Sequence, residues 1–150
     1  MSLRAPRIRL ALPFVAGVLL AGCGDGATFP PEFDASLSIN LSAMTKTASG
    51  LYYQDLAAGS GNSVKVGEKA TVAYSGWLPS GKKFDSGSFS FTVGVGQVVP
   101  GFDEGVLGMR VGGKRKLVLP PELGYGNQGV GSIPPNSTLV FEVELQKIGS

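Results

Sequence analysis

The segment Pro100-Gly101-Phe102-Asp103-Glu104-Gly105-Val106-Leu107 carries the only helix signal after residue 47. Proline suits the first turn of a helix, and the two acidic residues suit its positive N-terminal end. Phe102, Val106 and Met109 recur at helical spacing, so they should point towards a sheet. Gly108 can end the helix. The sequence therefore predicts one short helix with a single apolar face.

Strand signals lie on both sides of this helix. In residues 138–147, every second residue from Leu139 to Leu145 is apolar and should face the core, while the polar residues between them should face water. The other expected strands are residues 51–56, 69–78, 89–93 and 114–119, with turns at 59–62 and 79–81. Together these elements predict an α+β fold, in which a curved antiparallel β-sheet of about five strands is wrapped around one short helix.

Composition favours one domain without metal or cofactor chemistry. The chain has 150 residues, enough to bury a real core, and its 23 glycines and 10 prolines suit strands joined by turns. It has no histidine, the commonest general base and transition-metal ligand. Its single cysteine cannot form an intrachain disulfide. We expect no cofactor and no metal.

The formal charge of +2 overstates the basic character of the folded part. Arg4, Arg7 and Arg9 belong to a targeting segment, described below. Removing these three from the 13 basic residues leaves 10 against 11 acidic residues, a net charge of −1. Electrostatics therefore gives no support to nucleic-acid binding.

Four short pieces of the chain combine apolar or aromatic residues with a few polar tips. They are residues 82–86, 97–102, 123–126 and 133–135, and glycine or proline punctuates three of them. Such pieces can line a small apolar cleft that carries a few placed polar groups.

Five fragments in this region resemble the FKBP-type peptidyl-prolyl isomerases in order and in approximate spacing, from about Gly50 to Ile148. They are Tyr74-Ser75-Gly76, Gly81-Lys82-Lys83-Phe84-Asp85-Ser86, Val98-Val99-Pro100-Gly101-Phe102, Tyr125-Gly126 and Ile133-Pro134-Pro135. The resemblance implies the same α+β fold and the binding of proline-containing unfolded or partly folded polypeptides. It also implies peptidyl-prolyl cis-trans isomerase activity. We expect the protein to be a monomer.

The resemblance also implies a role for each matching residue. Phe102 would form the floor of the cleft, where the family commonly has tryptophan. The Ile133 N–H and the Tyr125 hydroxyl would hold substrate carbonyls, and Asp85, oriented by the Tyr74 hydroxyl, would lie beside the twisting carbonyl. Asp85 and Tyr125 are the catalytic candidates, and the substrate-binding candidates are Tyr74, Phe84, Phe89, Val98, Val99, Phe102, Ile133 and Phe141.

Simpler interpretations exist for several of these residues. Core packing alone would place Phe89, Phe91 and Phe141 where they are, and Asp85 by itself could be a turn residue. Residues 114–116, Lys-Arg-Lys, are expected to form a solvated strand face. The family often has an arginine that pairs with the aspartate, and the short segment between Asp85 and Phe89 lacks it.

The chemistry of proline isomerisation agrees with this composition. Rotation about the X–Pro amide crosses a barrier of about 18–20 kcal/mol without breaking a bond. In the twisted transition state the carbonyl oxygen is less negative, so a dry apolar cleft favours that state over the planar amide. Such an enzyme needs apolar walls and a few hydrogen bonds rather than a nucleophile or metal.

The N-terminus has the pattern of a bacterial lipoprotein. Three arginines precede residues 10–22, an uncharged apolar run shorter than the roughly 20 residues of a membrane span. Leu20-Ala21-Gly22-Cys23 resembles a lipobox, which implies cleavage before Cys23 and lipidation of its sulfur. The alternative is an ordinary signal peptide with Cys23 incidental. Lipidation would anchor the protein at the bacterial cell envelope, facing the periplasm from the outer membrane if the source is Gram-negative.

These features divide the chain into three parts. Residues 1–22 are the expected lipoprotein signal peptide, 23–47 the lipidated N-terminus and flexible tether, and 48–150 the isomerase domain. Leu37, Ile39 and Leu41 could lie on the domain as an extended strip or in a turn capped by Asn40. The predicted function is peptidyl-prolyl isomerisation that assists folding of exported proteins. The alternative is a non-catalytic peptide-binding or chaperone module with the same fold.

Overall fold

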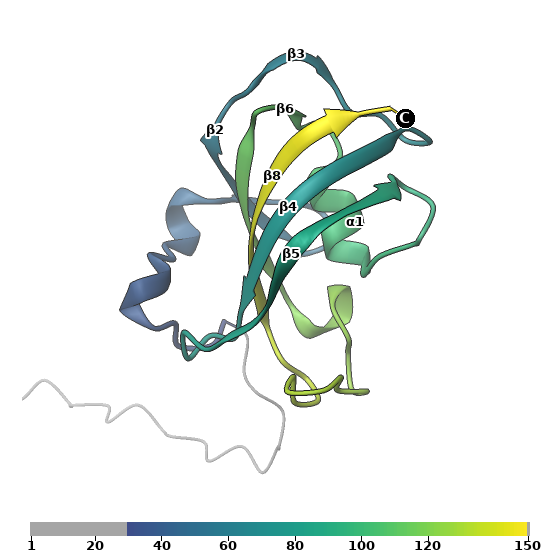
Figure 1. The fold of residues 1–150 in the computed structure, drawn as a ribbon. Helices are drawn as coiled ribbons and strands as arrows, with labels where there is room; N and C mark the ends of the chain where they lie inside the picture. The colour runs from purple at the N-terminus through teal and green to yellow at the C-terminus, as the bar shows by residue number, and fades with distance from the viewer. Residues whose placement is uncertain (1–29, 150) are drawn as a thin grey trace, which may run out of the picture.

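The computed structural model describes residues 30–149, which form one antiparallel sheet packed against the helix α1 (Pro100–Val106) (Figure 1). The six strands lie in the order β1 (Thr45–Lys46), β2 (Tyr52–Ala57), β7 (Lys114–Leu119), β8 (Leu139–Ile148), β4 (Lys69–Trp77) and β5 (Lys83–Thr92). Two short strands, β3 (Ser60–Ser63) and β6 (Arg110–Val111), pair separately. The predicted α+β fold is confirmed, with six strands in the main sheet rather than about five.

Helix α1 lies close against the concave face of the sheet. Phe102, Val106 and Met109 are all at most 3% exposed, as their spacing predicts. Gly105 permits the close approach, because a Cβ there would lie 2.6 Å from the side chain of Leu117. The helix ends at Val106, and two residues later Gly108 adopts a positive φ of 83°, which glycine tolerates.

Two elements differ from the sequence prediction. Strand β5 runs from Lys83 to Thr92 without interruption, because it pairs with β4 along its whole length, with one irregularity between Gly76 and Trp77. The expected turn at 59–62 overlaps strand β3, whose Ser-Gly-Asn-Ser sequence carries no strand signal. Its pairing with β6, far along the chain, determines its conformation.

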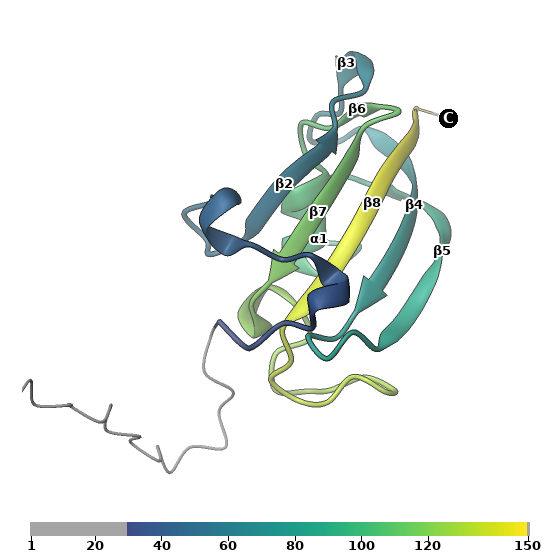
Figure 2. The same cartoon turned by 90° about the vertical axis from the view of Figure 1, so that its left-hand side faces the viewer.

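The segment before β1 is docked on the outer face of the sheet. It forms two 3-10 turns, η1 (Ala35–Leu37) and η2 (Leu41–Ala43), and Figure 2 shows it lying across β7 and β8. Leu37 and Met44 are 6% and 8% exposed and pack with Val118 and Val140. The segment is therefore docked on the domain, in turns rather than as an extended strip. Asn40 precedes η2 at the N-cap position but makes no side-chain cap hydrogen bond. Residues from Phe33 onward, which the sequence analysis placed in the tether, thus contact the sheet.

Hydrogen bonds fix this docked segment at two places. The Asp34 N–H donates to the Pro79 carbonyl at 2.7 Å, and the Lys116 ammonium donates to the Leu37 carbonyl at 2.7 Å. Lys116 also lies 3.4 Å from Glu142 and is 7% exposed. The prediction of a solvated face at residues 114–116 is therefore wrong for Lys116, and it holds for Lys114, whose side chain is 57% exposed.

The first 29 residues are outside the described part of the chain. The predicted signal peptide, the lipobox and Cys23 all lie there. Within residues 30–149, no helix combines the length and apolar character that crossing a bilayer requires.

Candidate active site

A cleft of about 450 Å³ opens between strands β4 and β5, the start of α1 and the loop after η3 (Pro121–Leu123). Most of its lining is aromatic or aliphatic, with one carboxylate, one amide and two phenols. The lining residues are Tyr74, Phe84, Asp85, Phe89, Gln97, Val98, Val99, Phe102, Tyr125 and Phe141.

Strand register brings the aromatic side chains of β4, β5 and β8 together. Gly76 on β4 pairs with both Asp85 of β5 and Phe141 of β8. A Cβ at Gly76 would lie 2.6 Å from the Phe84 ring and 2.8 Å from the Phe141 ring. The glycine thus leaves the space that these two rings fill, edge to face, with 5.6 Å between their centroids.

Phe102 lies at the centre of the aromatic group. Its ring centroid is 5.3 Å from that of Phe141, 5.8 Å from Phe89 and 6.0 Å from Tyr74. It is 3% exposed, so its face is available only from within the cleft. These side chains belong to the core and line the cleft at once, so the core and cleft interpretations are both correct for Phe89 and Phe141.

Asp85 is held by two donors. The Tyr74 hydroxyl donates to its Oδ2 at 2.5 Å, and the Ser86 N–H donates to its Oδ1 at 2.9 Å. The hydrogen bond to Asp85, followed by burial, raises the pKa of Tyr74 to about 12. Tyr74 therefore stays a neutral donor at physiological pH, and these two contacts orient Asp85 without an arginine.

Tyr125 lies at the mouth of the cleft and is 36% exposed. The flanking Gly126 has a φ of +58°, and its N–H donates to the Pro121 carbonyl at 2.9 Å. This turn holds the tyrosine over the cleft rather than in the core.

The structure does not bring Ile133 into the cleft lining. It is 7% exposed, and its N–H donates to the Val130 carbonyl at 2.8 Å, in a bridge that closes the loop. The other nine predicted site residues all line the cleft. Gln97 also lines it and was not predicted; its Oε1 accepts the Thr92 N–H at 2.8 Å. Its position directly before Val98, a predicted cleft residue, could have identified Gln97 from the sequence.

Comparison with known proteins agrees with this geometry. Residues 61–146 match the family model of FKBP-type peptidyl-prolyl cis-trans isomerases. An FK506-binding protein of Neisseria meningitidis serogroup B, strain MC58, is 51% identical over 105 residues, which cover 66% of this chain and 96% of that protein. The chain belongs to the FKBP-type peptidyl-prolyl cis-trans isomerases.

Solved FKBP structures agree as well. FkpA from Escherichia coli superposes with a TM-score of 0.65 at 44% identity, covering 71% of this chain and 51% of that one. AtFKBP13 superposes with the same TM-score at 39% identity, covering 69% and 97%. The isomerase interpretation is thus confirmed: the protein is an FKBP-type enzyme whose substrates are proline-containing peptides.

Proposed function

We propose that this FKBP acts at the bacterial cell envelope as a lipid-anchored monomer that assists the folding of exported proteins. We further propose that the cleft around Phe102 is its catalytic site. The observation that supports the catalytic site best is the convergence of six aromatic rings and one doubly held carboxylate in a single cleft.

In this mechanism the substrate proline rests on Phe102, between Tyr74, Phe84 and Phe141. These side chains exclude water from the X–Pro amide. Because the twisted amide is less polar than the planar one, an apolar environment lowers the free energy of the twisted state relative to the planar state. No covalent intermediate is needed.

Two polar side chains act on the substrate carbonyls. Asp85, fixed by Tyr74 and Ser86, lies beside the carbonyl that rotates and disfavours its planar, more negative form. The Tyr125 hydroxyl donates to a neighbouring carbonyl and holds the peptide partly twisted. The role expected of the Ile133 N–H requires that its bond to Val130 open first, so that the donor can turn to the substrate.

Isomerisation of a proline tetrapeptide, followed by NMR exchange, tests this site. Tyr125→Phe removes one hydrogen bond, a net loss of about 0.5–1.5 kcal/mol, so kcat/KM should fall roughly threefold to tenfold. Asp85→Ala should cost at least as much. Lys114→Ala, on the exposed outer face, is the control and should match the parent. A parent-like rate in both cleft variants would place catalysis elsewhere.

The proposed anchor is Cys23. The short apolar run and the Leu-Ala-Gly-Cys sequence support it, and Gly24 rather than aspartate after the cysteine favours the outer membrane in a Gram-negative cell. One acyl chain binds a bilayer only marginally, whereas the several chains of a lipoprotein hold firmly. Cys23→Ser should leave an uncut or mislocalised precursor in membrane fractionation. Normal maturation and localisation of that variant would contradict the proposal.

A further inference from the structure

A second hollow adjoins the cleft on the far side of Val98. Its volume is about 460 Å³, close to that of the cleft, and Val98 lines both. Pro100 at the start of α1, Leu107 at its end and the backbone of the glycine-rich loop at residues 94–96 form the rest of its mainly apolar surface. Leu107 is 38% exposed and presents an aliphatic side chain at the edge of this hollow.

The loop side of this hollow is fixed by a buried carboxylate. Asp103, 9% exposed, accepts the Gly94 N–H at 2.5 Å and the Gly96 N–H at 3.1 Å. Both glycines have positive φ, 83° and 79°, and a Cβ at Gly94 would lie 2.8 Å from Val66. The loop is therefore held in one conformation although it is exposed.

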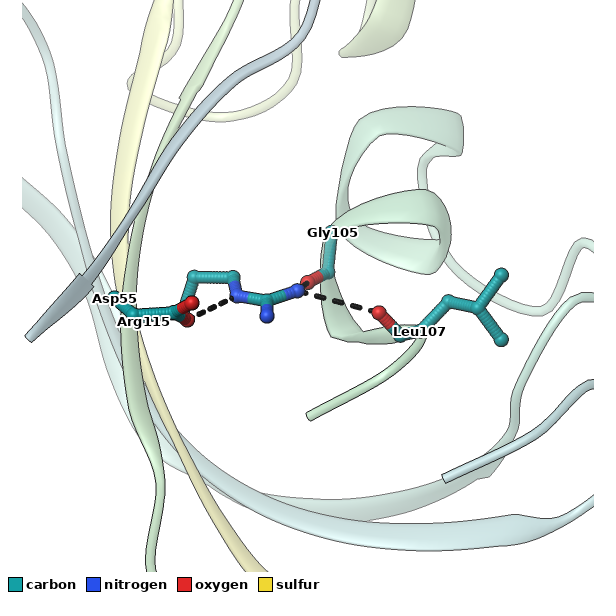
Figure 3. Close-up of polar contacts among 4 residues, drawn as sticks. All are labelled: Asp55, Gly105, Leu107 and Arg115. Carbon is teal, nitrogen blue, oxygen red and sulfur yellow. Dashed lines mark hydrogen bonds and ion pairs between the residues drawn. The ribbon is translucent and has the colours of Figure 1, made fainter. Parts of the chain in front are cut away.

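The helix side is fixed by Arg115, which reaches from β7 to the end of α1 (Figure 3). Its Nη1 donates to the carbonyls of Gly105 at 2.9 Å and Leu107 at 3.2 Å, and its Nε pairs with Asp55 at 2.7 Å. Figure 3 shows the Leu107 side chain pointing away from Arg115. The backbone that presents this exposed leucine is thus anchored by a charged group, the arrangement of a preformed contact site.

We propose that the second hollow binds an apolar side chain of the substrate polypeptide, a few residues from the proline that occupies the cleft. The inference rests on the proposed catalytic site, because the shared Val98 makes the two surfaces continuous. Both acidic residues of the lining are already engaged, Asp103 by the loop and Glu104 by the Ser49 hydroxyl at 2.6 Å. An uncharged, aliphatic occupant therefore fits best. Because the site is already rigid, it loses little conformational entropy when the occupant binds.

The experiment compares short and long substrates on the full-length protein. Decapeptides with the same X–Pro centre as the tetrapeptide carry one leucine, placed two to five residues before or after the proline in turn, or serine at the same position. For the position that reaches the hollow, the leucine peptide should have a kcat/KM about fivefold above the serine peptide, the gain expected from partial burial of one leucine.

The matched variants are Leu107→Ser and Leu56→Ser. Leu56 is 47% exposed and lies with Lys114 and Glu144 on the outer face of the sheet. Leu107→Ser should remove the gain from the leucine and leave the tetrapeptide rate within about twofold, while Leu56→Ser should keep both. The proposal is overturned if no leucine position gives a gain in the parent, or if Leu107→Ser keeps it.

Direct titration of the decapeptides separates this inference from the proposed catalytic site. The ratio of Kd values for the leucine and serine peptides should be about fivefold and should disappear in Leu107→Ser, whether or not the cleft catalyses isomerisation. A parent that lacks tetrapeptide activity but shows this ratio would contradict the catalytic site alone. Leu107-dependent dimerisation without a leucine preference would assign the hollow to self-association and overturn the proposal.

Discussion

The two faces of the sheet are covered by different kinds of structure. The concave face packs against α1, and the aromatic side chains between them leave a cleft open to peptide. The outer face is covered by residues 33–44, which have no α-helix and lie over Val118 and Val140 with Lys116 beneath them. The same strand supplies both faces, since β7 directs Leu117 and Leu119 inward and Lys116 and Val118 outward.

Because only the concave face carries the cleft, we expect the outer face to affect stability and the concave face to affect activity. Changes on the outer face should weaken the fold while the cleft of the folded protein keeps its shape. Changes on the concave face should reduce isomerisation more than their effect on stability alone explains. The predictions below test that separation in order of decreasing effect.

The largest effect should follow deletion of residues 30–46 from the full chain. The deletion removes two buried side chains, Leu37 and Met44, each contributing about 1.5–3 kcal/mol, so the free energy of unfolding should fall by about 3–6 kcal/mol. That is a large part of a domain's total of about 5–15 kcal/mol. Denaturant unfolding measures the loss, and the tetrapeptide kcat/KM per folded molecule should stay near that of the parent.

A milder variant keeps this test usable if the deletion does not fold. Lys116→Ala leaves the Leu37 carbonyl without its charged donor, at a cost of about 1.5–3 kcal/mol. The neighbouring Lys114→Ala removes only a surface pair with Glu144 and should cost about 0–1 kcal/mol. Equal stability of the two lysine variants would show that the docked segment contributes little.

Sequence patterns predicted the concave face well because its elements have strong periodicity. The helix limits agree to within one residue, and the alternation from Leu139 to Leu145 identified the inward side of β8. Nine of the ten expected cleft residues line the cleft, because the five fragments lie in elements whose register fixes them.

The outer face was predicted poorly, for a physical reason. The few large apolar residues of the segment are separated by serine, asparagine and alanine, so it has the composition of a tether. Its order depends on tertiary contacts with Val118 and Val140. Likewise Lys116 has the sequence environment of a solvated residue, and only the docked Leu37 carbonyl makes its burial favourable. The prediction that Ile133 lines the cleft missed a contact of the same kind, because its N–H donates to the Val130 carbonyl within its own loop.

The second prediction compares one substitution on both faces. Phe84→Ala removes a half-buried wall of the cleft and should cost about 2 kcal/mol of stability, less than a fully buried phenylalanine, and at least tenfold in kcat/KM. Phe33→Ala, on the half-buried phenylalanine of the docked segment, should lower stability comparably and leave kcat/KM unchanged. A similar loss of kcat/KM in both folded variants would show that the outer face also affects catalysis, which contradicts the proposed division between stability and activity.

The smallest effect concerns Tyr74, whose pKa is raised from 10.0 to about 12, chiefly by the hydrogen bond it donates to Asp85. Because the folded-state pKa lies above the unfolded value, this contribution to stability is fully present below pH 10 and is lost as the pH rises from 10 through 12. The tyrosine is only half-buried and lines an open cleft, so solvent screening keeps the stability change small compared with the other two predictions. In Asp85→Asn the Tyr74 pKa should fall towards 10.0, as followed by the Cζ chemical shift of Tyr74 against pH, whereas Lys114→Ala should leave it at about 12. An unchanged titration curve in Asp85→Asn would mean that burial, rather than the hydrogen bond to Asp85, raises the Tyr74 pKa. The Tyr74 hydroxyl would then not be the group that orients Asp85 in the cleft.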